Sequence, residues 1–350
     1  MSMSPGEQRA EAALLHVVPA LCAPTVRMRR PGRVRERVHE LRRAGGGRLQ
    51  VVSDFDLTLS RFAHGGRRCP SSYNILDNSK VVSEECRREL TALFDHYYPI
   101  ETDPQCPMEE KLPHMVEWWS RAHDLLCGQR IQRLQIAEVV RESGAMLREG
   151  YGAFFDTLHR HGIPLFIFSA GIGDILEEVI RQRGALHPNT HIVSNYMDFG
   201  DDGLLQGFKA PLIHIFNKNS SAAASYFQQL QGRTNVLLLG DSLGDLSMAD
   251  GVPGVQNVLK IGFLNDKVEE QRECYLDSFD IVLERDETLG VVNGLLQHIL
   301  CSGPAGAHRA PEGMHSRPQT QGPTTSSPRL CPHDPDPRAL TSCGHPVRGS

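Results

Sequence analysis

Short apolar runs in this chain end in polar side chains, and this pattern narrows the folds that it can adopt. Asp54 follows the first of these runs, Ser169 follows a second, and Asp241 follows a third after one glycine. Amphipathic stretches separate the runs, which is typical of a parallel sheet with helices on both faces. Ligands of such sheets bind beyond the carboxyl ends of the strands, so we expect the three side chains to converge there.

The runs and the stretches between them predict an α/β fold, a Rossmann-like three-layer core with a mostly parallel sheet. Strands are predicted at 49–53, 165–168, 192–193, 236–239, 259–261 and 281–283. Helices are predicted at 33–43, 173–183, 220–231, 266–275 and 287–300. An Asp-Gly step in 198–203 predicts a hairpin turn.

More than a hundred residues separate the first predicted strand from the second, and they show almost no strand-like alternation. We therefore expect an inserted helical cap, with helix-like spacing at 80–97, 109–128 and 130–147. The predicted domain boundaries are 26–68 and 151–300 for the catalytic core and 69–150 for the cap.

Both ends of the chain are expected to be disordered, over residues 1–25 and over a Pro-rich tail at 301–350. Nine of the 22 prolines lie beyond Cys301, where Ile, Phe, Tyr and Trp are absent. Such a segment cannot bury enough apolar surface to offset the entropy of ordering it.

Composition argues against several classes of partner. The net charge of −5 offers no basic surface for a nucleic-acid polymer, and the basic cluster from Arg27 to Arg43 is interpreted as a solvated helix face rather than a nucleic-acid arm. Nine cysteines without a C-x-x-C pair indicate free thiols in a reducing compartment. No run approaches the length of a membrane span, and Pro19 breaks the apolar segment near the start. We expect a cytoplasmic protein, monomeric, without a membrane partner.

The predicted convergence has a chemical meaning. Two neighbouring carboxylates suit a divalent cation, because Mg²⁺ takes oxygen ligands and bridges to substrate phosphate. Asp54 and Asp241 are the candidate ligands. Asp54 can also attack phosphorus to form an aspartyl-phosphate, while Asp56 acts as general acid and then as general base. Lys218 would neutralise the phosphate oxygens, and Ser169 with the amide of Ala170 would donate to them.

Each residue has a simpler interpretation when it is taken alone. An Asp-x-Asp after a strand is commonly a turn or a helix cap, Ser169 suits a helix N-cap, and Lys218 suits a surface position. Their occurrence together and in this order favours a site.

Five neighbouring residues complete this set of interpretations. Gly171 and Gly173 permit a close backbone approach to the phosphate. Asp245 either orients Lys218 or a metal-bound water, or caps a helix. Asp174 and Glu177 are assigned to a solvated helix face.

The ordered motifs resemble those of the haloacid dehalogenase-like phosphatase superfamily, DxDxT/S, S/T, K and GDxxxD. They are matched here by Asp54-Phe-Asp-Leu-Thr58, Ser169, Lys218 and Gly240-Asp241-Ser-Leu-Gly-Asp245. From about Val26 to Leu300 the chain further resembles the cytosolic 5′-nucleotidase III family, especially its 7-methylguanosine phosphate-specific branch. The stretches that carry this likeness are 69–76, 98–101, 111–119, 167–174 and 249–255.

This resemblance implies hydrolysis of a nucleoside 5′-monophosphate. It implies that Asp54 is the nucleophile, that Asp56 is the acid and base, and that Mg²⁺ is held by the Asp54 carboxylate, the Asp56 carbonyl and Asp241. It also implies that Ser169, Ala170 and Lys218 hold the phosphate.

Two cap residues align with the family's base-binding positions. Glu101 can accept hydrogen bonds from guanine or cytosine, and the Trp119 indole attracts the cationic ring of 7-methylguanine. The resemblance therefore implies 7-methylguanosine monophosphate as preferred substrate, with CMP also accepted. Taken alone, Trp119 fits a core stripe with Leu112, Val116 and Leu126. Trp118 is interpreted as structural, and Ala122 replaces a serine of pyrimidine-type relatives.

Two other functions share parts of this pattern. A phosphatase of the same superfamily that acts on phosphoserine or a sugar phosphate would carry the same four motifs. A non-catalytic scaffold would act through the Pro-rich tail, for example through 328–337.

Overall fold

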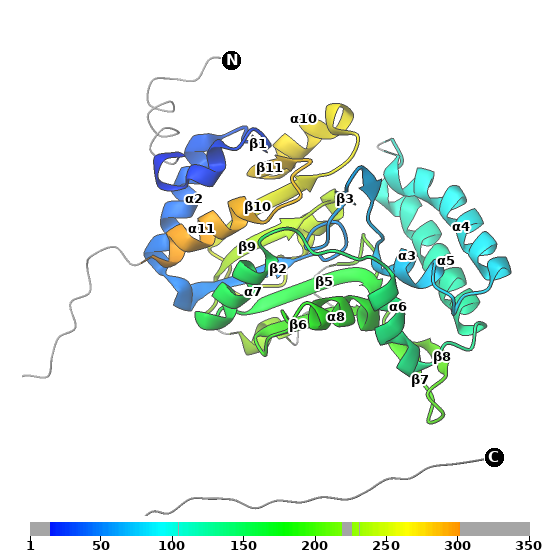
Figure 1. Cartoon of the computed structure of the whole chain (residues 1–350). Coiled ribbons are helices and arrows are strands. Elements are labelled where there is room, and N and C mark those ends of the chain that lie inside the picture. Colours follow the sequence, from blue (N-terminus) through cyan, green and yellow to red (C-terminus); the bar gives the residue numbers. More distant parts are fainter. Residues whose placement is uncertain (1–14, 104, 219–225, 231, 302–350) are drawn as a thin grey trace, which may run out of the picture. The chain divides into compact units, whose positions relative to one another are not determined.

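The computed structural model describes residues 15–301 except 104, 219–225 and 231. The strands of its central sheet are β1 (Val26–Arg27), β2 (Leu49–Ser53), β5 (Leu165–Ile172), β6 (Thr190–Asn195), β9 (Asn235–Gly240), β10 (Asn257–Leu264) and β11 (Ile281–Glu284). They lie in the order β1-β11-β10-β9-β2-β5-β6 (Figure 1). Every neighbouring pair is parallel except β1 with β11.

The predicted α/β class and all six predicted strands are confirmed. The seventh strand, β1, escaped prediction because it has two residues and pairs with a strand more than 250 positions away, Val26 opposite Leu283.

Alternate side chains of the strands point to opposite faces of the sheet, and both faces are covered. Val51 and Ile167 belong to one apolar cluster, whereas their neighbours Val52 and Phe166 belong to another. The helices that contribute to the first cluster include α2 (Pro31–Ala44), α7 (Tyr151–Arg160), α8 (Gly173–Gln182) and α11 (Gly290–Leu300). Those of the second are α10 (Val268–Ser278) and the 3-10 helix η4 (Leu243–Ser247).

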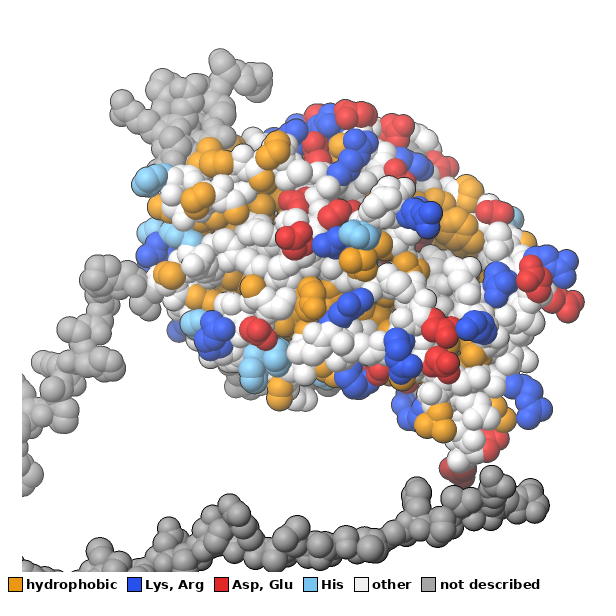
Figure 2. Space-filling model, in the orientation of Figure 1, with side chains coloured by type: hydrophobic (Ala, Val, Ile, Leu, Met, Phe, Trp, Pro, Cys, Tyr) orange, Lys and Arg blue, Asp and Glu red, His pale blue; other side chains and the backbone are white. Residues whose placement is uncertain are grey.

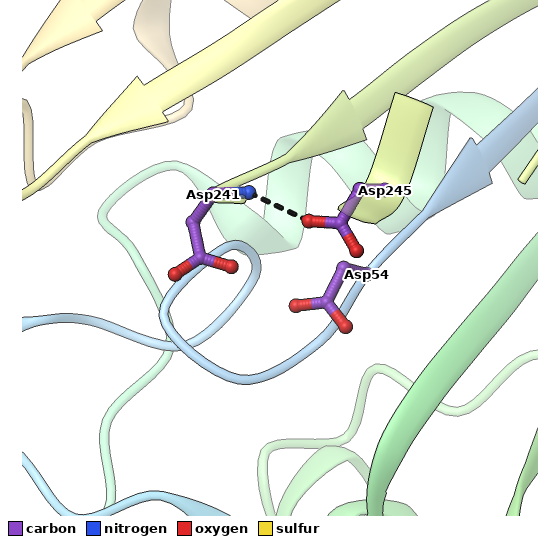
Figure 3. Close-up of side chains that lie close together, drawn as sticks. All are labelled: Asp54, Asp241 and Asp245. Carbon is purple, nitrogen blue, oxygen red and sulfur yellow. Dashed lines mark hydrogen bonds between the residues drawn. The ribbon is translucent and has the colours of Figure 1, made fainter. Parts of the chain in front are cut away.

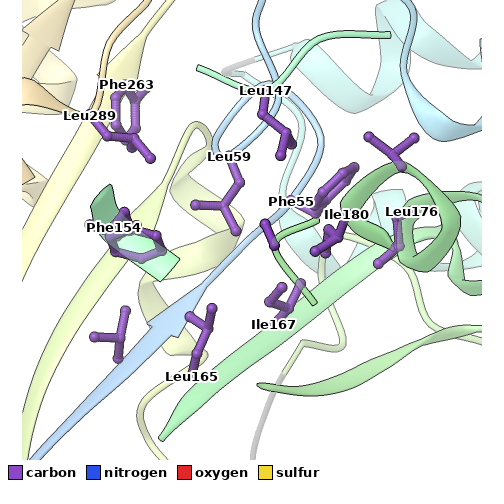
Figure 4. Packing of buried hydrophobic residues seen from close by; sticks show 14 of the residues in the cluster. Phe55, Leu59, Leu147, Phe154, Leu165, Ile167, Leu176, Ile180, Phe263 and Leu289 are labelled. Atoms are coloured by element: carbon purple, nitrogen blue, oxygen red, sulfur yellow. The ribbon is translucent and has the colours of Figure 1, made fainter. Parts of the chain in front are cut away.

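Figure 4 shows how the first face is filled. Phe154 of α7 and Ile180 of α8 pack toward Leu165 and Ile167 of β5, and all four side chains are fully buried. The covering of both faces confirms the predicted three-layer core. It also explains why the strands appear in the sequence as continuous apolar runs.

The region between β2 and α7 is mainly helical, as expected for a cap. Its elements are the hairpin of β3 (Ala63–His64) and β4 (Arg67–Arg68), then α3 (Ser72–Asp77), α4 (Glu84–Thr102), α5 (Met108–Cys127), the 3-10 helix η3 (Arg133–Gln135) and α6 (Ile136–Glu142). Helices α4 and α5 pack against each other, whereas α3 and α6 lie against α8 of the core (Figure 1).

The predicted hairpin forms from β7 (Met197–Phe199) and β8 (Leu205–Phe208) and packs on the cap. The ring of Phe208 stacks on His123 of α5 with centroids 3.7 Å apart. The boundaries 26–68, 69–150 and 151–300 stay predictions, because α6 and this hairpin each contact the other part.

Residues 15–25 differ from the predicted loose segment 1–25. They include the 3-10 helix η1 (Pro19–Cys22), and Val18 and Leu21 are buried. Gly294 of α11 leaves room for this packing, since a Cβ there would lie 3.1 Å from the Ala20 Cβ. Residues 1–14, the tail 302–350 and most of the predicted helix 220–231 lie outside the described residues.

Every helix in the described part of the chain is too short or too polar to span a bilayer.

Candidate active site

Three carboxylates meet at the carboxyl ends of β2 and β9, as the positions of the strands predict. Asp54 follows β2, and Asp241 and Asp245 follow β9. One oxygen of each lies within 4.8 Å of the others (Figure 3). Neighbouring strands bring them together, and the Asp54 amide donates to the Leu239 carbonyl at 3.0 Å.

Lys218 and Asp245 are tied to this cluster. The Lys218 ammonium donates to Asp54 and, at 2.9 Å, to Asp245 Oδ1. Asp245 Oδ2 accepts from the amides of Asp241 and Ser242, at 3.1 and 3.0 Å. Asp245 therefore has both of the predicted roles: it orients Lys218, and it also caps η4. Its two oxygens are occupied, which leaves Asp54 and Asp241 to face a ligand.

The electrostatics of this cluster favour an added cation. Burial raises the pKa of Asp54 to about 7 against the opposing charge of Lys218. Burial also raises the pKa of Asp241 well above its usual range, and the charges of Asp54 and Asp245 add to this. Three carboxylates face one ammonium, which is an excess of two negative charges when all are ionised. A divalent cation would balance this excess, so the donor set fits one.

Asp56 is held by a residue that the motifs did not reveal. Its Oδ1 accepts from the Ser72 amide at 2.8 Å and its Oδ2 from the Ser72 hydroxyl at 2.6 Å. The same hydroxyl accepts from the Ile172 amide at 3.1 Å. Burial raises the pKa of Asp56, although both bonds from Ser72 favour the carboxylate. Asp56 is thus a partly buried acid in a fixed orientation.

Gly171 is required by the close packing around Asp56. A Cβ at this position would lie 2.2 Å from the Ser72 hydroxyl and 2.6 Å from Asp56 Oδ2. At Gly173 it would lie 2.7 Å from the Tyr196 ring. At Gly171 and Gly173, the close approach that the structure shows is therefore between the glycine backbone and side chains of the protein.

Ser169 and Ala170 lie where the pairing of β5 with β6 is interrupted, between Phe168 and Ile172. The Ser169 hydroxyl accepts from the Gly171 amide at 3.0 Å, and Asn195 Nδ2 donates to the Ala170 carbonyl at 2.8 Å. The N-cap interpretation of Ser169 is wrong, because α8 begins after Ile172. Asn195, which fixes this segment, has no motif that would reveal it.

All of the predicted site residues line one cavity of ≈510 Å³ between the sheet and the cap: Asp54, Asp56, Glu101, Trp119, Ser169, Ala170, Lys218 and Asp241. Trp119 Nε1 donates to the Ala170 carbonyl at 3.3 Å, which links the cap to the core. Burial raises the pKa of Glu101 to about 7, while Lys111 and Lys218 oppose the shift. Ala122 also lines the cavity.

Three weaker interpretations need correction. The apolar stripe of α5 is not all core, because Val116 is 46% exposed and Trp119 lines the cavity. Trp118 lines the cavity as well, although it was expected to be structural only. Asp174 is not on a solvated face, since it accepts from the Met197 amide at 2.7 Å. Glu177 accepts from the Tyr196 hydroxyl at 3.0 Å.

Asp77, at the end of α3, also lines the cavity, and its Oδ1 is buried without a hydrogen-bond partner among the described residues. Burial raises the pKa of Asp77 from 3.8 to about 7. The raised pKa of Asp77 therefore stabilises the folded state fully below pH 3.8, and this stabilisation is lost as the pH rises through about 7.

We expect Asp77→Asn to increase the free energy of unfolding by about 1–3 kcal/mol at pH 8 and by less at pH 5. Denaturant unfolding at both pH values measures this. The exposed Asp95 supplies the control variant Asp95→Asn, which should change neither value. Equal effects of Asp77→Asn at the two pH values would contradict the prediction.

The comparisons with known proteins agree with this geometry. The family described as Pyrimidine 5′-nucleotidase (UMPH-1) matches residues 57–300. The chain is 73% identical over 288 residues to the 7-methylguanosine phosphate-specific 5′-nucleotidase of Homo sapiens, covering 82% of this chain and 96% of the relative. The protein of the same name from Drosophila melanogaster is 39% identical over 289 residues, covering 81% of this chain and 90% of the relative.

One solved structure shares the fold of this chain over nearly the whole length of that structure. The crystal structure of cytosolic 5′-nucleotidase IIIB bound to cytidine is similar with a TM-score of 0.77 and 39% identity, covering 81% of this chain and 97% of that one. The matched family, the curated relatives and the fold agree. The chain belongs to the pyrimidine 5′-nucleotidase family and is a 5′-nucleotidase.

Proposed function

We propose that this enzyme hydrolyses 7-methylguanosine 5′-monophosphate preferentially, and CMP as well, through a phosphorylated Asp54. The observation that carries the proposal is the cavity that is lined by Asp54, Asp56 and Lys218 and also by Glu101 and Trp119. The carboxylates with Lys218 suit a phosphate and its cation, and Glu101 with Trp119 suits a base. Relatives named for 7-methylguanosine phosphate and a neighbour that holds cytidine support the two substrates.

In the first step an Asp54 oxygen attacks phosphorus, and the bond between phosphorus and the 5′-oxygen breaks. Asp56, whose pKa is raised by burial, acts as the general acid and gives its proton to the departing 5′-oxygen. In the second step the Asp56 carboxylate removes a proton from water, which attacks phosphorus. Phosphate leaves and the Asp54 carboxylate is regenerated. The two hydrogen bonds from Ser72 hold the Asp56 carboxylate in one orientation.

The cation in this proposal is Mg²⁺. The Asp54 and Asp241 carboxylates with the Asp56 carbonyl would hold it, and it would supply positive charge to the transferred phosphoryl group. Lys218 stays an ammonium, since the charges of Asp245 and Asp54 raise its pKa against the effect of burial. It would neutralise phosphate oxygens, while the Ser169 hydroxyl and the Ala170 amide donate to them.

The base would be recognised by Glu101 and Trp119. N7-methylation gives guanine a positive charge, which the Trp119 ring attracts and the buried Glu101 carboxylate balances. Because burial raises the pKa of Glu101 to about 7, a cationic base would restore its ionised form. A neutral cytosine offers hydrogen-bond donors to Glu101 but no positive charge to balance its carboxylate. We therefore infer that CMP binds more weakly.

Replacement Trp119→Ala tests the stacking. We expect the KM for 7-methylguanosine monophosphate to rise by about tenfold or more and the KM for CMP to rise less. Trp119→Phe keeps an aromatic face and serves as the matched variant, with a smaller effect. Equal increases for both substrates in Trp119→Ala would reject the cation–π argument.

We further propose that the enzyme works as a cytoplasmic monomer without a nucleic-acid partner. On the face shown in Figure 2, basic and acidic side chains of the described residues are interspersed, which does not favour a polyanion. Sedimentation of the purified full chain tests the monomer.

A further inference from the structure

Arg148 is a wholly buried arginine that holds the loop after Asp56. It lies between α6 and α7 in the sequence and is 0% exposed. Its Nε donates to the Thr58 carbonyl at 2.7 Å and its Nη2 to the Leu57 carbonyl at 2.6 Å. Its guanidinium stacks over the ring of Phe263, 4.2 Å from the centroid. A single side chain therefore binds two successive carbonyls of this loop.

The other contacts of Arg148 come from the ends of β10 and β11. Its Nη1 donates to the Asp286 carbonyl, and its Nη2 donates to Asn265 Oδ1 at 2.8 Å. Asn265 Nδ2 donates to the same Leu57 carbonyl at 2.9 Å. The Leu57 carbonyl thus has two donors, both anchored in the core.

The loop that these donors hold has an uncommon backbone. Leu57 has φ of 62°, in the left-handed region that residues other than glycine rarely adopt. Leu57 follows Asp56 directly, and the Thr58 hydroxyl donates to Asp241 Oδ1 at 3.3 Å. The orientation of these two peptides therefore affects Asp56 on one side and Asp241 on the other.

We propose that Arg148 is a positioning residue for the hydrolysis, which acts by holding Leu57 and Thr58 so that Asp56 and Asp241 face the phosphate together. The donors of Arg148 match this task, because a planar guanidinium can bind several carbonyls at fixed angles. The inference rests on the role proposed for Asp56. Asp56→Asn tests that role separately, and full turnover in this variant would overturn the proposed function itself.

A second bridging arginine provides a matched control. Arg233 donates to the carbonyls of Gly46, Leu49 and Gly162 at 2.7, 2.8 and 2.9 Å. These contacts lie at the amino ends of the strands, away from the cavity. Arg148→Met removes four donated hydrogen bonds and an ion pair with Glu287, and Arg233→Met removes three donated hydrogen bonds. Only the first set reaches the loop after Asp56.

The experiment measures kcat, KM for CMP and Tm for Arg148→Met, Arg148→Lys and Arg233→Met in the full chain. We expect Arg148→Met to lower kcat by about 100-fold with KM changed less than about threefold, because misplaced reacting groups lose rate more than affinity. Arg148→Lys should have a kcat about tenfold higher than that of Arg148→Met. Arg233→Met should lower Tm with kcat within about twofold.

Asn265→Ala keeps the test decisive if Arg148→Met does not fold. It removes one donor to Leu57 and should lower kcat by about tenfold. A folded Arg148→Met with normal kcat would overturn the proposal. So would equal losses of kcat in Arg148→Met and Arg233→Met, or a normal kcat in Asn265→Ala.

Discussion

Asp54→Asn is expected to reduce phosphate release from 7-methylguanosine monophosphate by about 10⁴-fold or more. The carboxamide has no anionic oxygen to attack phosphorus, and it is a weaker ligand for a divalent cation. Steady-state phosphate assays with Mg²⁺ present measure this loss. CMP should lose rate by a similar factor, because both substrates use the same nucleophile.

The variant should stay folded. Asp54 is one of three carboxylates near one ammonium, and burial raises its pKa to about 7, so its charge does not stabilise the fold at neutral pH. We expect a Tm within a few degrees of the wild type. Asp95→Asn, on the exposed surface of α4, is the control with normal turnover. Turnover of Asp54→Asn near that of the control would exclude the proposed nucleophile.

Gly171→Ala is expected to lower kcat by about 100-fold or more. The added methyl group would lie 2.2 Å from the Ser72 hydroxyl and 2.6 Å from Asp56 Oδ2, so it must displace one or both. This disturbs the hydrogen bonds from Ser72 to Asp56 and brings the methyl group to 3.1 Å from the Ser169 hydroxyl, whereas Asp54, Asp241 and Lys218 are not among its three nearest contacts. Single-turnover rates with CMP measure the effect on the chemical step.

Gly152→Ala is the matched control for this substitution. Gly152 lies in the first turn of α7, and a Cβ there meets nothing within 4 Å. Because alanine favours helix, this variant should be more stable by a few tenths to about 1 kcal/mol, with normal kcat. A normal kcat in Gly171→Ala would show that Asp56 does not need its contact with Ser72.

The strands and the acidic cluster could be predicted because both depend on local pattern. A strand buried on both faces appears as an unbroken apolar run, and Val236 to Leu239 is such a run. Parallel strands place the residues that follow them at one edge, so Asp54 and Asp241 could be paired without a structure. Neither prediction requires knowledge of distant contacts.

The residues that hold the catalytic groups could not be predicted in this way. Ser72 contacts Asp56 across 16 positions, and Arg148 contacts Leu57 across 91. A serine near the start of a helix and one arginine between an apolar residue and Glu149 have ordinary surface interpretations. Only the fold shows that both are buried at the site.

Asp174 illustrates the reverse error. Its place in the first turn of an amphipathic helix favours a solvated side chain, and the hydrogen bond that it accepts comes from the start of β7. Tertiary contact outweighed the local pattern there. The same reason explains why 15–25 are packed, since Val18 and Leu21 are buried.

Chemical trapping of the intermediate tests the central claim most directly. The full-length enzyme is mixed with ³²P-labelled 7-methylguanosine monophosphate and Mg²⁺, quenched in acid, reduced with borohydride and digested for mass spectrometry. The account predicts labelled protein during turnover and homoserine at position 54, the product of reducing an aspartyl-phosphate. Active enzyme that yields no label, or homoserine at another aspartate with Asp54 unchanged, would contradict it.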